Sequence, residues 1–238
     1  MSLRIKFIQF LLNVNEHFIF YPRLAKFYRT AIQVNNPVIF DVGANKGQTI
    51  RFFLKLFPGA TIYAFEPNKK LFKKLQSEFG HNSNIHLINK GVSNQTGKLT
   101  LKETVTDETS TFEELNYNSA YLKMKAKVLG VTPEAVVKDQ YEVEVITLSS
   151  FINEVKPGAV HVVKIDTEGH EMKCLQGLFT GAKPGVEYIQ LEHHHDDMYQ
   201  NAIKDGEMTA WLQQKDYELS TTIKHGFGDF VELVFRKK

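Results

Sequence analysis

The chain of 238 residues has a single cysteine, Cys174, and its formal net charge is only +2. One cysteine excludes an internal disulfide framework and any C-x-x-C metal or redox motif. Because such a chain suits a reducing compartment, we expect a cytoplasmic protein. No stretch is dense in Lys or Arg, so we expect no nucleic-acid partner.

Long hydrophobic runs are also scarce. The apolar run from Phe7 to Val14 is interrupted by Gln9 and is too short to span a bilayer, and no signal-peptide cleavage site follows it. Apolar residues at positions 5, 8, 11 and 12 have helical spacing. We therefore predict an N-terminal helical extension, residues 1–35, that packs on the main domain or on a second copy in a homodimer. Weak contact with a membrane surface is the alternative.

From residue 38 onward, β-rich apolar stretches alternate with helical patterns. This alternation is typical of a parallel sheet covered by helices on both faces. Five parallel strands are predicted, and the last two apolar stretches, "YELSTT" and "DFVELVFR", predict an antiparallel hairpin. The predicted parallel strands are 38–42, 61–66, 85–92, 159–166 and 186–194.

This layout resembles the class I methyltransferase fold, a Rossmann-like α/β sheet with a terminal antiparallel hairpin. We expect one such domain over residues 36–238. Residues 104–142 are polar, rich in threonine and partly helical. Long insertions of this kind are usually lids or binding loops, so we predict that this one lies on the acceptor side of the site.

Acidic side chains follow four of the predicted strands: Asp41, Glu66, Asp166 and Glu192. In an open α/β sheet, ligands bind beyond the carboxyl ends of the strands. Several carboxylates in one crevice would repel a pyrophosphate. They favour a ligand with a positive centre, an amine and ribose hydroxyls, and S-adenosylmethionine has all three.

The loop after the first strand, in "VIFDVGANKGQT" (38–49), contains glycines but lacks the G-x-G-x-x-G fingerprint. Gly43 and Gly47 would let the chain turn sharply and let a ligand approach the backbone. The helix that begins near Gly47 offers free N–H groups to the methionine carboxylate. Asp41 would face the amino group, and Glu66 would take the ribose hydroxyls, although NAD-binding folds also place an acid there.

Five stretches together resemble the FkbM family of S-adenosylmethionine-dependent methyltransferases: "VIFDVGANKGQT", "AFEPN", "TLSSFI", "VVKIDTEGHEMKCLQG" and "EYIQLEHH". The resemblance runs from about residue 36 to 195, and its most specific part is K-I-D-x-E-G-x-E followed by a strand that ends in Glu. It implies methyl transfer to a hydroxyl of a sugar, a glycan or a related biosynthetic intermediate. The chain departs from the family at Asn94 and Ser149, where an acid is common; Asn94 could still bind the adenine amino group.

The residues and the resemblance together predict a cofactor site beyond the first four strands. Its predicted members are Asp41, Gly43, Ala44, Asn45, Gly47, Gln48, Thr49, Glu66, Pro67, Asn68, Val92, Ser93, Asn94 and Asp166.

Methyl transfer from a sulfonium is an in-line displacement that requires alignment, and an alcohol acceptor benefits from a base. Asp166, at the end of a strand beside the crevice, is the best-placed candidate base. His170 could titrate near neutral pH, although a capping or surface histidine is the alternative. The full set of candidate catalytic residues is Asp166, Glu168, His170, Glu192 and His193.

The sequence "EHHHDD" (192–197) suggests a metal site at first sight. Consecutive strand residues point to opposite faces, so the three histidines cannot all converge. A divalent metal held by Glu192, Asp166 and one histidine is the less favoured alternative to a metal-free site. Four residues are predicted to contact the acceptor, with a polar surface loop as the alternative: Thr109, Ser110, Thr111 and His195.

Two other functions remain open. An NAD-dependent Rossmann oxidoreductase is disfavoured by the missing G-x-G-x-x-G and by the predicted hairpin. A catalytically silent, cofactor-binding partner subunit is disfavoured by the presence of Asp41, Glu66 and Asp166.

Overall fold

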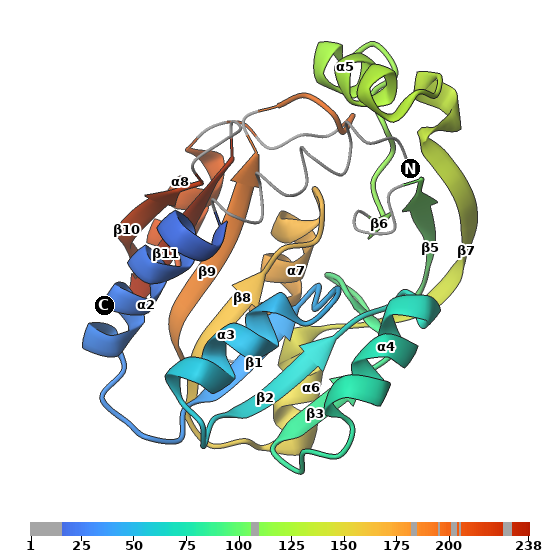
Figure 1. The fold of residues 1–238 in the computed structure, drawn as a ribbon. Helices are drawn as coiled ribbons and strands as arrows, with labels where there is room; N and C mark the ends of the chain where they lie inside the picture. The colour runs from blue at the N-terminus through green and yellow to red at the C-terminus, as the bar shows by residue number, and fades with distance from the viewer. Residues whose placement is uncertain are drawn as a thin grey trace.

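The structure is a computed structural model, and it describes residues 16–105, 110–181, 185–194, 196–200, 204, 206–225 and 230–238. A seven-stranded sheet with the strand order β10-β11-β9-β8-β1-β2-β3 forms its centre (Figure 1). Its strands are β1 (Val38–Val42), β2 (Thr61–Phe65), β3 (Ile85–Ile88), β8 (Val160–Ile165), β9 (Val186–His194), β10 (Tyr217–Lys224) and β11 (Phe230–Lys237).

Strands β3, β2, β1, β8 and β9 run parallel to one another, and β11 pairs antiparallel with both β9 and β10. The predicted sheet of five parallel strands with a terminal hairpin is therefore confirmed. Strands such as "VIFDV" are apolar almost throughout because both faces of the sheet are covered. The glycine-rich turn of the hairpin, residues 226–229, lies outside the described residues.

Helices cover the two faces of the sheet with two separate hydrophobic cores. One core lies under α2, α3 and α4, and the other under α6, α7 and α8 (Figure 1). The helices are α2 (Tyr21–Ala31), α3 (Gln48–Leu56), α4 (Lys69–Phe79), α6 (Leu148–Val155), α7 (Glu171–Leu178) and α8 (Glu207–Gln213).

The N-terminal part begins with η1 (Glu16–Phe20) and continues into α2. Leu24 and Tyr28 of α2 are buried in the first core, and the Tyr28 hydroxyl donates a hydrogen bond to Gln190 on β9 at 2.6 Å. The predicted amphipathic helix around residues 5–12 lies outside the described residues. Within the described ranges, no helix is both long and apolar enough to cross a membrane.

A second, four-stranded sheet has the order β4-β7-β5-β6 and stands beside the carboxyl edge of the main sheet (Figure 1). The strands are β4 (Gly91–Val92), β5 (Gly97–Thr104), β6 (Ser110–Thr111) and β7 (Val137–Ile146). The prediction of one strand over residues 85–92 is wrong, since β3 ends at Ile88 and Gly91 pairs with Val145 of β7. Between the two strands, the Asn89 side-chain amide donates hydrogen bonds to the carbonyls of Glu66 and Pro67 (2.8 and 3.3 Å). These bonds connect the chain to the segment after β2, beyond the point where backbone pairing between β3 and β2 ends.

The insertion contains α5 (Ala120–Leu129) and η2 (Pro133–Val136) besides β6. These elements form a small core of their own together with Met198 and Tyr199, which follow β9. The Leu115–Tyr199 bridge and a hydrogen bond from the Asn116 N–H to the Met198 carbonyl (2.8 Å) fasten the two segments together. The insertion therefore covers the edge where the parallel strands end.

Gly177 offers a test of how the two sheets are joined. A Cβ at this position in α7 would overlap the carbonyl oxygen of Ser93, which follows β4. We expect Gly177→Ala to lower the free energy of unfolding by about 2 to 3 kcal/mol, because helix and strand must separate. Urea denaturation measures this change. Gly185→Ala, where a Cβ meets no atom within 4 Å, is the matched control, and equal stability of the two variants would contradict the prediction.

Candidate active site

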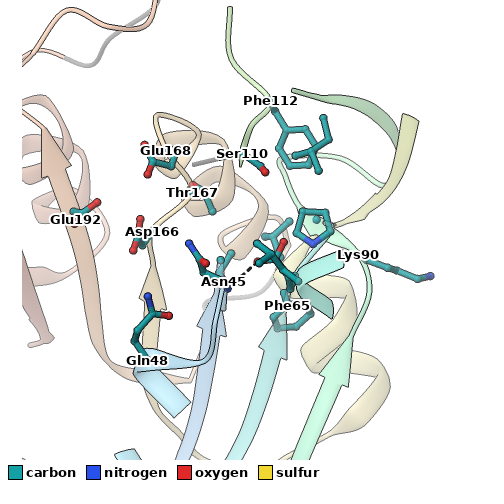
Figure 2. A pocket seen from close by; sticks show the side chains of 18 of the residues that line it. Asn45, Gln48, Phe65, Lys90, Ser110, Phe112, Asp166, Thr167, Glu168 and Glu192 are labelled. Atoms are coloured by element: carbon teal, nitrogen blue, oxygen red, sulfur yellow. Dashed lines mark hydrogen bonds between the residues drawn. The ribbon is translucent and has the colours of Figure 1, made fainter. Parts of the chain in front are cut away.

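A cavity of about 360 Å³ opens at the carboxyl ends of β1, β2 and β8, beneath the insertion. Its size lies in the range of small-molecule sites, about 300–1,000 Å³. Figure 2 shows Asp166, Glu168 and Glu192 on one side of it and Phe112 with Ser110 across from them. The predicted site residues that line it are Gly43, Asn45, Gln48, Glu66, Pro67, Val92, Ser110, Asp166, Glu168 and Glu192.

The glycine-containing loop after β1 is held by its neighbours. The N–H groups of Gly43 and Ala44 both donate to the carbonyl of Phe65 at the end of β2 (3.1 and 3.0 Å). Gly43 has a φ of 85°, and a Cβ there would overlap the carbonyl oxygen of Asp166. Gly47, with a φ of 81°, packs against Phe79 and begins α3. These glycines are therefore required for close backbone contacts within the protein.

Glu66 is buried at the end of β2 and faces the cavity. Its two carboxylate oxygens accept hydrogen bonds from the backbone N–H groups of Asn45 and Asn68, both at 2.8 Å. Burial raises the pKa of Glu66 to about 7, although these two hydrogen bonds act in the opposite direction. Each oxygen keeps a second lone pair, so this oriented carboxylate can still accept from ligand hydroxyls. Asn68 itself caps α4 by accepting from the N–H groups of Lys70 and Leu71.

The ammonium of Lys164 on β8 lies between the carboxylates of Asp41 and Asp166, below the cavity. It donates to Asp166 at 2.9 Å and lies 3.9 Å from Asp41, which pairs with Lys164 across the β1–β8 register. Burial alone lowers the pKa of Lys164, but Asp166, Asp41 and Glu232 raise it above its ordinary value. Burial raises the pKa of the Asp41 carboxyl to about 6, against the effect of Lys164. Asp41 lines neither this cavity nor a second, smaller cavity of about 100 Å³ behind the glycine-containing loop. Its predicted contact with an amino group therefore stays a prediction.

The turn between β8 and α7 places Glu168 at the cavity in a left-handed conformation, with a φ of 55°. The Tyr199 hydroxyl donates to the Glu168 carboxylate at 2.9 Å, and the Thr111 hydroxyl donates to the Glu168 carbonyl at 2.7 Å. Glu171 accepts from the N–H groups of Thr167 and Gly169 and thereby stabilises the turn. The insertion thus positions Glu168 from two sides.

His170 does not reach the cavity. Its ring is buried, with Nδ1 2.6 Å from a Glu113 carboxylate oxygen and Nε2 3.0 Å from the Ser93 hydroxyl. Burial lowers the pKa of His170 despite the hydrogen bond to Glu113. A base must reach the proton that it removes, so the structure contradicts the catalytic role predicted for His170 and gives it a structural role instead.

Several other predicted site residues also lie away from the cavity. Asn94 is exposed and its amide donates to Gln176 at 3.4 Å, while Ser93 is buried against His170. Neither residue lines the cavity, so the adenine contact predicted for Asn94 stays a prediction. Thr111 is buried beneath Glu168. Strand alternation turns His193 to the face opposite Glu192, and His193 lines neither cavity. Thr109 and His195 lie outside the described residues.

Ala44 and Thr49 line the second cavity, of about 100 Å³, which shares Asp166 and Glu192 with the first. The metal set predicted with Asp166, Glu192 and one histidine is not found with His193 among the described residues, and His195 lies outside them, so that alternative stays a prediction. Within the described ranges, the residues that gather as potential metal ligands are Glu192, His225 and Glu232.

The sequence reasoning missed Lys164, although it stands in the quoted K-I-D stretch. The available signal was a lysine in the apolar run "AVHVVKID", because a charge inside a buried strand requires charged partners. The cavity-lining residues Lys90, Phe112 and Lys125 were missed as well. Phe112 and Lys125 belong to the insertion that was predicted on the acceptor side, but the sequence does not show which of its side chains face the cavity, and Lys90 lies between β3 and β4, where one continuous strand was predicted.

Comparisons with known proteins fit this arrangement. Residues 41–219 match the family model described as the methyltransferase FkbM domain. The chain belongs to this family. It is 26% identical over 174 residues to 31-O-demethyl-FK506 methyltransferase FkbM of Streptomyces tacrolimicus, an alignment that covers 67% of this chain and 66% of that protein. It is 31% identical over 64 residues to 2-O-methyltransferase NoeI of Sinorhizobium fredii, which covers 27% of this chain and 26% of NoeI.

The aligned part therefore spans just under two thirds of the FkbM relative's own length. Among solved structures, magnesium protoporphyrin IX methyltransferase (ChlM) from Synechocystis PCC 6803, with bound SAM, superimposes with a TM-score of 0.52 at 11% identity. That superposition covers 92% of this chain and 78% of ChlM. At this identity it supports the class I methyltransferase fold, which the strand order shows independently.

Glu66 predicts a specific dependence of stability on pH. Its pKa is about 7 in the folded protein and 4.5 ordinarily, so between these values the folded protein binds the extra proton, and stability falls as pH rises through this window. We expect the free energy of unfolding to fall by about 2 kcal/mol more in the wild type than in Glu66→Gln between pH 5 and pH 8. Urea denaturation at both pH values measures the difference.

The control is Glu142→Gln, which removes an exposed carboxylate and should keep the wild-type pH dependence. If the wild type and Glu66→Gln lost the same stability over this range, the raised pKa of Glu66 would be refuted.

Proposed function

We propose that this protein is an S-adenosylmethionine-dependent O-methyltransferase that methylates a hydroxyl of a sugar, a glycan or a related biosynthetic intermediate. The observation that carries the proposal is the carboxylate of Asp166, which is held by Lys164 at the mouth of the cavity in a chain that matches the FkbM family.

The cofactor assignment rests on the shape and charge of the cavity. Glu66 presents an oriented carboxylate at the end of β2, suited to ribose hydroxyls, and Gln48 brings the first turn of α3 to the cavity wall. The N–H groups of a first helical turn lack partners within the helix, so they suit the methionine carboxylate. Asp166 and Glu192 supply negative charge toward a sulfonium. ChlM, which shares the fold, is described with bound SAM.

The reaction transfers the methyl from sulfur to oxygen in one displacement. The C–S bond breaks as the acceptor oxygen attacks, the electron pair stays on sulfur as S-adenosylhomocysteine, and the acceptor loses its proton. Asp166 takes that proton, since its carboxylate lines the cavity and its side chain is 30% exposed. The protein contributes chiefly alignment of the two substrates and this base.

The acceptor lies under the insertion. Ser110, Phe112, Tyr121 and Lys125 line that part of the cavity, and together they offer a hydroxyl, two aromatic rings and an ammonium. Such a surface suits a polar ring compound that carries several hydroxyls. The names of the two relatives point to O-methylation of their own substrates, which supports a hydroxyl acceptor here. The NAD-dependent alternative is disfavoured by the terminal hairpin and by the family match.

Mass spectrometry tests the proposal directly. The protein is incubated with S-adenosylmethionine carrying a deuterated methyl group and with a panel of oligosaccharides and hydroxylated metabolites. We expect one compound to gain the labelled methyl while S-adenosylhomocysteine accumulates, and isothermal titration to show binding of S-adenosylmethionine and none of NAD. Binding of NAD without binding of S-adenosylmethionine would overturn the proposal. Cofactor binding without turnover across the whole panel would favour the silent-subunit alternative.

Asp166→Asn tests the base. The variant keeps the shape of the side chain but cannot accept the proton, so we expect kcat to fall by about 10² to 10⁴-fold. The Kd for S-adenosylmethionine should rise by a much smaller factor, because one of the negative charges near the sulfonium is lost. His170→Gln is the comparison, because His170 lies outside the cavity. It should lower the Tm and leave the kcat of the folded fraction near the wild-type value. The reverse pattern would return the catalytic role to His170.

A further inference from the structure

The smaller cavity lies behind the glycine-containing loop, between that loop, α2 and the ends of β9 and β11. Its volume is about 100 Å³, and it shares Asp166 and Glu192 with the larger cavity. Phe20, Tyr21 and Leu24 cover it on the side of the N-terminal helix. It is therefore a small recess that lies next to the candidate active site and shares part of its wall.

Two carboxylate-bearing residues lie opposite each other on neighbouring strands in this recess. Glu192 of β9 and Glu232 of β11 are direct partners in the antiparallel register. Side chains of such a pair lie on one face of the sheet, and like charges placed directly opposite are destabilising. The cost is greater here because Glu232 is almost fully buried. A cation between the two carboxylates would convert this repulsion into attraction.

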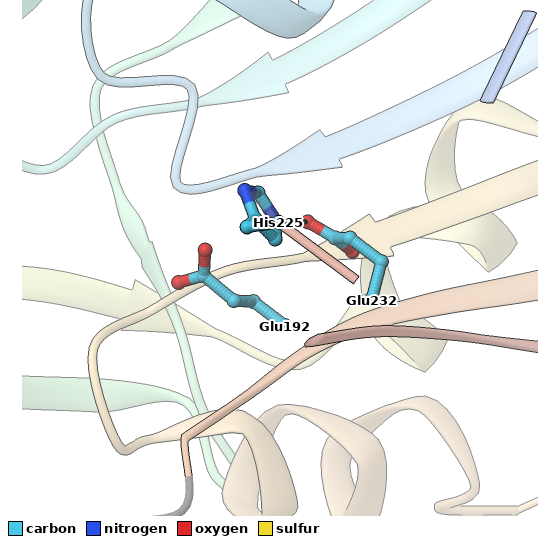
Figure 3. Close-up of side chains that lie close together, drawn as sticks. All are labelled: Glu192, His225 and Glu232. Atoms are coloured by element: carbon cyan, nitrogen blue, oxygen red, sulfur yellow. Dashed lines mark ion pairs between the residues drawn. The ribbon is translucent and has the colours of Figure 1, made fainter. Parts of the chain in front are cut away.

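A histidine completes the group. His225, directly after β10, is 7% exposed in its side chain, and its Nε2 lies 3.7 Å from Oε1 of Glu232. One ligand atom from each of Glu192, His225 and Glu232 lies within 4.8 Å of the other two (Figure 3). Metal–oxygen and metal–nitrogen bonds of about 2.0–2.2 Å place ligand atoms up to about 4.4 Å apart across an ion. Small side-chain rotations would therefore close the group around one cation.

The surrounding residues hold two of these side chains in position. Gln190 donates to Oε2 of Glu232 at 3.0 Å, and the hydroxyl of Tyr28 on α2 donates to Gln190 at 2.6 Å. The ring of His225 stacks on Phe20, with centroids 4.0 Å apart and planes inclined by 19°. Metal ligands are commonly oriented by such outer hydrogen bonds and packing.

The charge of the recess also favours a cation. Three carboxylates line it, those of Asp166, Glu192 and Glu232, whereas Lys164 is the one lysine or arginine among the described residues that line it. The Lys164 ammonium is bonded to Asp166 at 2.9 Å and lies 3.9 Å from Asp41. The carboxylates that line the recess therefore outnumber its lysine and arginine side chains, and the formal charge of the lining is negative.

We propose that Glu192, His225 and Glu232 form a binding site for one divalent first-row transition-metal ion. Two carboxylates and one imidazole suit ions such as Mn²⁺ or Zn²⁺ better than Mg²⁺, which prefers oxygen ligands alone. Three protein ligands leave open coordination positions. Because Glu192 and Asp166 line both cavities, an acceptor hydroxyl that reached the ion would have a lowered pKa beside the proposed base. This second role rests on the proposed methyl transfer, whereas the binding site does not.

Metal binding is tested on the full-length protein without cofactor or acceptor. After treatment with a chelator and desalting, the protein is titrated with MnCl₂ while electron paramagnetic resonance follows the free ion, and calorimetry repeats the titration with ZnCl₂. We expect one saturable site per chain. Glu232→Gln and His225→Ala should each weaken binding by at least about tenfold, and Glu218→Gln, an exposed acid on β10, should bind as the wild type does.

Thermal denaturation provides a check on folding. In chelator, Glu232→Gln should be at least as stable as the wild type, because it removes the like-charge pair. Added Mn²⁺ should raise the Tm of the wild type and of Glu218→Gln but not that of Glu232→Gln. Absence of a saturable site in the wild type, or unchanged binding in both ligand variants, overturns the proposal.

An activity measurement shows whether the bound metal ion also acts in methyl transfer. If chelator abolishes turnover and Mn²⁺ restores it in the wild type alone, the ion acts in the reaction. If Mn²⁺ binds as described but turnover is the same in chelator, the site stands and its catalytic role is refuted. If no methyl transfer is found at all while Mn²⁺ binds, the proposed function fails and the metal site does not.

Discussion

The arrangement of the candidate site depends on one buried ammonium. Lys164 lies inside the main sheet between Asp41 and Asp166, and without it the buried carboxylate of Asp41 and the partly exposed carboxylate of Asp166 would have no positive charge between them. Burying an unpaired charge costs several kcal/mol, so the lysine is what allows acids to collect at the ends of parallel strands. It also orients Asp166 toward the cavity. Beside it, the cluster of Glu192, His225 and Glu232 is the basis for inferring a cation there.

The second constraint is that the insertion must be tied to the strand ends that it covers. Thr111 donates to the backbone of Glu168, and Glu113 accepts from His170 and from Lys173 on α7. The turn after β8 therefore has two roles: it forms part of the cavity wall, and it holds the insertion in place. His170 in this turn consequently joins the insertion to the main domain, and Glu168, two residues earlier, is the carboxylate that faces the cavity.

Much of the fold was predictable because local patterns match it. The strands are apolar almost throughout, since both faces are covered, and the helices carry regular apolar stripes, so their order alone indicates a parallel sheet with a terminal hairpin. The prediction failed at residues 85–92, which were predicted as one strand although the chain changes sheets between β3 and β4. Which strands pair is decided by contacts between residues distant in sequence, such as Gly91 with Val145. The periodicity of apolar residues within one stretch does not predict such contacts.

By itself, the sequence determined the family, the sheet and the acids that end its strands, because these follow from motifs and from side-chain periodicity within short stretches. Only the tertiary structure decided which polar residues reach the cavity. His170 and Asn94 stand close in sequence to residues that do reach it, yet His170 is buried in a hydrogen-bonded pair and Asn94 points to Gln176. Glu192 and Glu232, forty residues apart in the numbering, meet because antiparallel pairing puts them opposite each other. Direction and proximity of side chains depend on how distant segments pack, and that information is absent from any local pattern.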